Sequence, residues 1–249
     1  MRHDLVAVGY QIDRYLPSHL KGNAILYGQA RVVEECRPLP AELVYRGWLT
    51  GSAFKTYQEH GVVCGQGLIF GLKELNRLSP SLFTPTTKSN TDGHDESMTL
   101  DEFEIQFGDK SERFTHSVYD SAASIAMKRN IVIADTKFEV GTDCRKRLVL
   151  IDERLMPDSS RYLLASDIEA ACATGAKPPS FDKQPIRDYV QEHLGVGPKT
   201  PLTPDAIARV HGHRYPQSLI EETVDRYEQV VFLLTGMTSD EYVGEFFLR

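Results

Sequence analysis

Four charged residues in the middle of the chain are spaced so that they could act on a phosphorylated substrate. Alternate residues of a β-strand share a face, so Asp135, Lys137 and Glu139 are expected to project together. If the next strand folds back, Asp152 can approach Glu139, and two neighbouring carboxylates repel unless a cation lies between them. Magnesium takes one or two protein carboxylates together with nucleotide phosphates, so the group predicts a Mg²⁺ and ATP site. The alternative is a solvated strand face on which Lys137 neutralises its neighbours.

A second group lies much earlier in the sequence and suits a phosphate. Arg46 stands at the end of an apolar stretch, and a guanidinium can donate to a phosphate through two N–H groups. Gly51 and Ser52 follow at the predicted start of a helix, where glycine allows close approach and free backbone N–H groups bind anions. The alternative is a surface arginine followed by an ordinary capping serine.

A long loop between these two groups also carries polar side chains. Residues 62–98 contain Pro80 and Pro85, and a loop of this length in a compact domain is often functional. Lys88, His94, Asp95 and Glu96 could close over a polar substrate and exclude water. The alternative is an acidic surface loop.

Composition limits the classes of protein that fit. The chain has 249 residues, enough for one large domain or two small ones, and a net charge of −7 argues against a general nucleic-acid binder. No apolar run is long enough for a membrane span. Four scattered cysteines favour neither zinc nor a disulfide framework, and they fit a reduced cytoplasm best.

Hydrophobic periodicity and capping signals predict the elements that hold these residues. Strands are expected at 30–34, 42–46, 131–140 and 148–152, the last two as an antiparallel pair joined by a turn that starts at Gly141.

Helices are expected from Ser52 to Gly61, after Thr99 with a Glu102 capping box, near Pro185–His193, and from Thr203-Pro204. Two helices should bury apolar stripes. The stripes are Phe114, Val118, Ala122, Ile125 and Ala126 in one, and Ile220, Val224, Tyr227, Val231 and Leu234 in the other, which Ser218 and Glu221 should cap before Gly236 ends it. This mixture predicts an α+β fold.

Two motifs resemble those of the SAICAR synthetase family of purine biosynthesis. The first, P-x-E-x-x-x-R-x-x-x-T-G-S, is matched from Pro40 to Ser52, and the second, D-x-K-apolar-E-x-G, is matched from Asp135 to Gly141. Val140 departs mildly from the second motif, since phenylalanine is usual there. The stretch from Phe83 to Lys88, followed by Gly93 to Glu96, also resembles longer-looped members of the family, except that Ser97-Met98 stands where Asn-Ile is usual. The resemblance implies antiparallel sheets with flanking helices around an ATP-grasp or kinase-like cleft between two subdomains.

The resemblance also implies the site. The implied residues are Lys137 and Asp135 as catalytic residues, Glu139 and Asp152 as metal ligands, and Arg46, Gly51, Ser52, Arg161, Lys88, His94, Asp95, Glu96 and Asp158 as substrate-binding residues. Arg46, Ser52 and Arg161 are expected to converge on the phosphate of an imidazole ribonucleotide. The segment from Ser180 to Asp188 also matches a family stretch near the active site, where support and direct contact are both open.

The implied reaction is the ligation of carboxyaminoimidazole ribonucleotide to L-aspartate, with ATP and Mg²⁺. The alternatives are an amide ligase for another acid or amine, and a remnant that binds the ribonucleotide without turnover. The implied partners are small molecules, with no nucleic acid and no membrane. The chain could also form a homo-oligomer.

Family members normally begin with a Gly-Lys hairpin that covers ATP, and no such motif occurs in this sequence. Residues 1–45 are therefore expected to be the rest of a small nucleotide-binding subdomain, and residues 46–249 the larger one. The chain could be a fragment, could start at the wrong codon, could be completed by a second polypeptide, or could have lost ATP binding. We expect weak ATP binding by the chain alone and a persistent ribonucleotide site.

Overall fold

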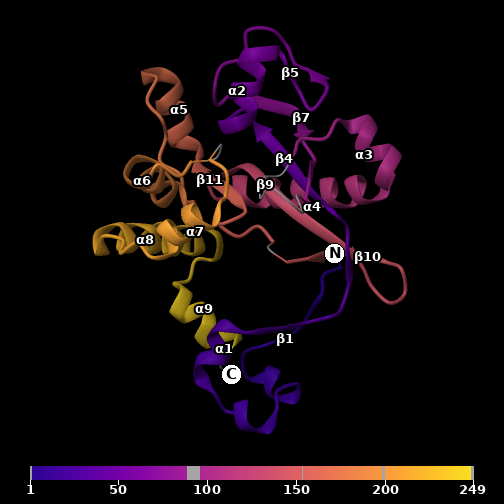
Figure 1. Ribbon diagram of the computed structural model, residues 1–249, viewed down its shortest axis with the longest axis vertical. Coiled ribbons are helices and arrows are strands. Elements are labelled where there is room, and N and C mark those ends of the chain that lie inside the picture. The colour runs from indigo at the N-terminus through magenta and orange to yellow at the C-terminus, as the bar shows by residue number, and fades with distance from the viewer. Residues whose placement is uncertain (1, 89–95, 153, 198–199, 248–249) are drawn as a thin grey trace.

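The chain folds around one antiparallel sheet with helices packed against it, which confirms the predicted α+β class (Figure 1). The computed structural model describes residues 2–88, 96–152, 154–197 and 200–247. Its strands are β1 (Leu5–Val8), β2 (Arg31–Val33), β3 (Arg37–Pro38), β4 (Ala41–Trp48), β5 (Val62–Val63), β6 (Gln66–Gly67), β7 (Arg77–Phe83), β8 (Thr86–Thr87), β9 (Ile131–Thr142), β10 (Leu148–Ile151) and β11 (Ser160–Leu164).

Among the described residues, seven of these strands form the main sheet, and β1-β2 and β5-β6 form two small sheets of their own. The helices are placed around the main sheet and along the N-terminal segment (Figure 1). They are α1 (Ala24–Gln29), α2 (Gly51–His60), α3 (Leu100–Phe107), α4 (Lys110–Met127), α5 (Ala165–Thr174), α6 (Gln184–Leu194), α7 (Pro204–His211), α8 (Gln217–Thr235) and α9 (Ser239–Phe246), with short 3₁₀ helices at Gly9–Arg14 and Ser18–Leu20. None of the helices in the described ranges combines the length and the apolar character that a bilayer crossing requires.

Strand β9 organises the sheet because it pairs with several other strands. The main path runs β10-β9-β4-β7, and β3 and β11 also pair with β9. The predicted β9–β10 pair is confirmed, with Leu150 opposite Val140 and Ile151 opposite Glu139. The turn begins later than predicted, since Gly141 still pairs with Val149.

Gly141 stays in the sheet because β3 approaches it closely. A Cβ there would lie 3.0 Å from the Arg37 carbonyl oxygen, so glycine permits a contact that a larger residue would push apart.

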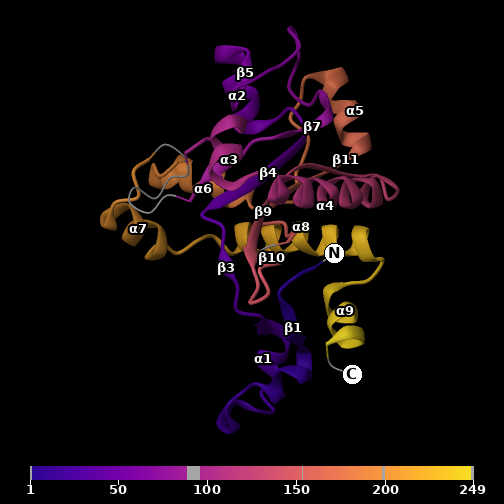
Figure 2. The same ribbon diagram turned by 90° about the vertical axis from the view of Figure 1, so that its right-hand side faces the viewer.

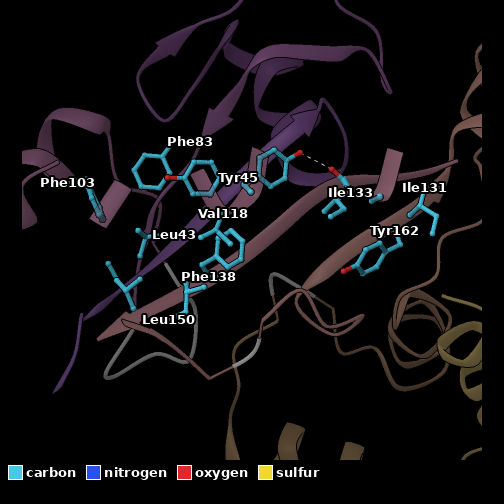
Figure 3. Packing of buried hydrophobic residues seen from close by; sticks show 14 of the residues in the cluster. Leu43, Tyr45, Phe83, Phe103, Val118, Ile131, Ile133, Phe138, Leu150 and Tyr162 are labelled. Atoms are coloured by element: carbon cyan, nitrogen blue, oxygen red, sulfur yellow. Dashed lines mark hydrogen bonds between the residues drawn. The ribbon is translucent and has the colours of Figure 1, made fainter. Parts of the chain in front are cut away.

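The main core lies between the sheet and helix α4, which runs along it (Figure 2). Tyr45 and Phe138 from β4 and β9 meet Val118 and Tyr119 of α4, and all four are buried (Figure 3). The Tyr119 hydroxyl donates to the Ile133 carbonyl oxygen at 2.8 Å. These contacts fix the sheet that presents the charged residues.

Local capping signals were mostly right. The Thr99–Glu102 capping box is present, Thr203 caps α7, and Gly61 ends α2 in a left-handed conformation. The predicted start of the last long helix was wrong: α8 begins at Gln217 after Pro216.

The prediction that two helices bury their apolar stripes was only partly right. Ile125 of α4 is 59% exposed, and Val224 of α8 is 52% exposed, whereas Val230 is buried.

The N-terminal segment lies beside the C-terminal helix, away from β4 and β7 (Figure 1). Strands β1 and β2 pair there, the Tyr10 N–H donates to the Phe247 carbonyl oxygen at 3.1 Å, and Asp4 pairs with Arg154. Strand β4 runs across residue 45 into the central sheet. The division of the chain into two subdomains at that residue stays a prediction.

Candidate active site

Two arginines meet one carboxylate at the centre of the sheet. Asp135 lies on β9, with Arg46 of β4 in register on one side and Arg161 of β11 in register on the other. The Asp135 Oδ2 atom is 3.3 Å from Arg46 Nη1 and 3.5 Å from Arg161 Nη1. The strand pairing itself therefore brings together residues that are far apart in the sequence.

The first turn of α2 completes this cluster. The Ser52 hydroxyl lies 3.5 Å from Arg46 Nη2, and the Thr50 hydroxyl accepts from Arg161 Nη1 at 2.8 Å. Gly51 has a φ of +60°, and a Cβ there would lie 2.9 Å from Arg161 Nη1. Glycine thus allows the guanidinium to lie against a helix start, whose free N–H groups and positive dipole end favour an anion.

Buried polar residues hold both guanidinium groups in place. Thr84 accepts from Arg46 Nε at 3.0 Å, and Asp182 lies 3.6 Å from Arg161 Nε. Asp182 is 5% exposed and also accepts from Ser180 Oγ at 2.7 Å. Since a guanidinium carries five N–H donors, these contacts orient each arginine and still leave donors for a ligand.

Sequence reasoning gave no role to Thr50, Thr84 or Asp182. Thr50 and Asp182 lie inside segments that match family motifs, and that match is the signal that could have identified them.

Further along β9, the charges of the same strand face are paired. Lys137 Nζ lies 2.6 Å from Glu42 Oε1 of β4, and Lys88 pairs with Glu139. Glu42 and Glu139 are 7% and 8% exposed. Residues two apart on a strand are roughly 7 Å apart, so this group adjoins the arginine cluster.

Asp152 leaves the strand at the end of β10. Its φ is +58°, its side chain is 55% exposed, and its carboxylate lies 3.8 Å from Arg31. Its neighbour Ile151 is opposite Glu139. No group of three or more His, Cys, Asp or Glu side chains in the described ranges is arranged for a metal ion, so a site shared by Glu139 and Asp152 stays a prediction.

Comparison with known proteins decides the family. A model of the SAICAR synthetase family matches residues 9–201. The chain belongs to this family.

The similarity to SAICAR synthetases extends over most of the chain. A Polaromonas protein named phosphoribosylaminoimidazole-succinocarboxamide synthase is 36% identical over 244 residues, which cover 91% of this chain and 78% of that protein. A Methylococcus capsulatus protein of the same name is 40% identical, with 89% and 75% covered. The structure of a Saccharomyces cerevisiae SAICAR synthase complexed with SAICAR matches with a TM-score of 0.73 and 29% identity, covering 96% of this chain and 76% of that one.

The other residues implied by resemblance to SAICAR synthetases are more dispersed. Asp158 accepts from the Tyr227 hydroxyl of α8 at 2.5 Å, and burial, together with the Asp158 carboxylate, raises the pKa of that hydroxyl. The Glu96 carbonyl accepts from the Thr87 N–H at 2.8 Å, which closes the base of the loop. His94 and Asp95 lie outside the described residues.

Proposed function

We propose that this chain ligates L-aspartate to carboxyaminoimidazole ribonucleotide with ATP, the reaction that its family catalyses in purine biosynthesis. The observation that supports this most directly is that Arg46 and Arg161 both contact Asp135 beside the first turn of α2. These two arginines suit a single phosphate, next to the face of β9 that is rich in carboxylates and lysines. We place the enzyme in the cytoplasm.

The chemistry requires activation of a carboxylate, which is a poor electrophile. An oxygen of the substrate carboxylate attacks the γ-phosphorus of ATP, and ADP leaves. The aspartate amine then attacks the acyl carbon, phosphate leaves, and the nitrogen loses a proton. The protein supplies positioning and charge neutralisation for both steps.

We assign roles from the geometry of the sheet. Arg46, Arg161 and Ser52 bind the phosphate of the ribonucleotide, which fixes its carboxylate further along β9. Lys137 lies there, two residues from Asp135, and its ammonium can neutralise the reacting carboxylate or a nucleotide phosphate. We propose that Asp135 and Lys137 are the catalytic residues.

Glu139 and Asp152 fit a magnesium ion by the chemistry of their donors. Both offer carboxylate oxygens, and each has a cation of the chain nearby, Lys88 for Glu139 and Arg31 for Asp152, which supports the assignment. When bound, magnesium would neutralise the phosphates of ATP.

The test is a coupled assay of ADP release with Mg-ATP, L-aspartate and the ribonucleotide. The expected result is ADP release that depends on both other substrates. Calorimetry with the ribonucleotide alone and a panel of acids and amines complete the experiment. ADP release with another acid or amine only would replace the proposal by a different ligase, and ribonucleotide binding without any ADP release would replace it by a non-catalytic binder.

A further inference from the structure

A basic groove lies between the start of α4 and the turn that joins β9 to β10. Its volume is about 500 Å³, and its lining residues are Arg2, Lys110, Phe114, Lys146, Arg147 and Leu148. The four polar residues among these are all cationic, although the chain as a whole carries a net charge of −7. Arg147 is already paired with Asp143, since its Nη2 lies 2.6 Å from Asp143 Oδ2, so an anion in the groove is attracted mainly by Arg2, Lys110 and Lys146.

The groove is separate from the candidate active site, because none of the residues assigned there lines it. A smaller hollow of about 260 Å³ adjoins it and shares Arg2 and Arg147. That hollow also contains Glu34 and Asp143. Asp143 also contacts Arg147, which lines both hollows.

The turn between β9 and β10 positions two of the cations. Asp143 accepts from the backbone N–H groups of Arg145 and Arg147 at 2.9 and 2.8 Å, and from Arg147 Nε at 2.6 Å. Lys146 adopts a φ of +59° within the same turn. The conformation of the turn thus fixes the backbone positions from which the Lys146 and Arg147 side chains extend.

Helix α4 adds to the positive potential on the opposite side of the groove. Lys110 is its first residue, and the N-cap Asp109 makes no side-chain capping hydrogen bond. Asp109 pairs with Arg113 and Glu112 lies in the first turn, so the positive charge that α4 brings to the groove is that of Lys110. Phe114, one turn later, packs partly against the core and lines the groove with Leu148.

We propose that this groove binds a nucleoside polyphosphate at a second site, apart from the reaction centre. Arg2, Lys110 and Lys146 receive the phosphates, and the Phe114 ring with Leu148 forms an apolar wall for the flat base. The groove is shallow and open to solvent, so binding through its charges should depend strongly on salt. Inorganic polyphosphate shares the charge but lacks the base, so the two ligands separate the contributions of the cations and the apolar wall.

The experiment measures binding of GTP and of inorganic triphosphate by calorimetry in the wild type and in three variants. The first is Lys137→Ala, which alters the proposed nucleotide-binding part of the active site and leaves the groove unchanged. The second is Lys110→Glu with Lys146→Glu. The third is a matched control, Lys128→Glu with Lys177→Glu, which reverses two exposed charges away from the groove.

The expected result is GTP binding that persists in Lys137→Ala and in the control but weakens about tenfold or more in the groove variant, with steep salt dependence. GTP should also bind more tightly than inorganic triphosphate. Loss of binding in Lys137→Ala alone, or equal loss in the control, would overturn the proposal. Equal affinity for the two ligands would overturn the assignment of the apolar wall to a base.

Discussion

Asp135 holds two guanidinium groups at a spacing set by the strands on either side of it. A single carboxylate between two arginines reduces their mutual repulsion and holds the Nη1 atom of each near the same oxygen. Arg46 and Arg161 are 15% and 21% exposed, so a phosphate bound there would be partly shielded from water. Charge interactions in such a setting are stronger than on an open surface.

Replacing Arg46 with alanine should weaken ribonucleotide binding far more than ATP binding. Hydrogen bonds to charged groups contribute roughly 1.5–3 kcal/mol, so the affinity for the ribonucleotide should fall by about ten- to a hundredfold. Calorimetry with each ligand measures this, and Arg129→Ala, an exposed arginine beyond α4, is the matched control. An equal loss of affinity for both ligands would remove Arg46 from the phosphate site.

Glu139→Gln should abolish ligation while the protein stays folded. The amide keeps the volume of the buried side chain but removes the negative charge that we assign to the metal. Its partner Lys88 is 36% exposed and can turn to water, so little stability should be lost. Turnover and the urea midpoint are the measurements, with the exposed Glu59→Gln as control. Full activity in Glu139→Gln would exclude Glu139 from the mechanism.

Several site residues could be predicted from sequence because their motifs are local. Arg46 and Ser52 are six positions apart, and the strand period alone places Asp135, Lys137 and Glu139 on one face. The supporting contacts of Thr84 and Asp182 could not be predicted, because they depend on which strands become neighbours. Arg161 reaches Asp135 only because β11 pairs with β9 beside β4.

At the scale of elements, capping boxes were predictable and buried faces were less so. Thr99 and Glu102 act within one turn, so their pattern is sufficient. The start of α8 was wrong because the chain enters the helix directly after Pro216, which leaves Ser218 inside the first turn. Its apolar residues exceed what the neighbouring elements cover, so Val224 stays exposed while Val230 packs into the core.

The turn between β9 and β10 should depend on pH through Asp143. Hydrogen bonds from the Arg147 backbone, and then from its side chain, lower the pKa of Asp143. A lowered folded-state pKa gives stability that is present above the unfolded value, about 3.9 for aspartate, and is lost as the pH falls through the folded value.

The difference in unfolding free energy between wild type and Asp143→Asn should therefore be greatest near neutral pH and shrink below about pH 4. Urea unfolding across this range measures it, with Asp225→Asn on α8 as an exposed control. A difference that stays constant down to the lowest pH would show that the charge of Asp143 does not hold the turn.

At the scale of the whole molecule, the two ends of the described chain stabilise each other. Figures 1 and 2 both show α9 beside the N-terminal segment. The Tyr10 N–H donates to the Phe247 carbonyl oxygen, and the Asp4 N–H donates to the Leu150 carbonyl oxygen, both at 3.1 Å. The N-terminal segment thus links the C-terminal helix to strand β10, which precedes Asp152.

Gly9→Ala should release this contact. Gly9 has a φ of +58°, and a Cβ there would lie 1.9 Å from the Phe247 carbonyl oxygen, so backbone must move. Gly22 is the matched control, since its φ is +76° but nothing lies within 4 Å of an added Cβ. Gly22→Ala should cost about 1 kcal/mol of stability from the left-handed conformation alone.

Gly9→Ala should cost clearly more stability and should speed amide exchange in α9 and the 3₁₀ helix Gly9–Arg14, while exchange in β9 stays slow. Urea unfolding and hydrogen exchange by mass spectrometry measure both effects. If the two variants lose equal stability and exchange in α9 is unchanged, the two ends do not stabilise each other through this contact.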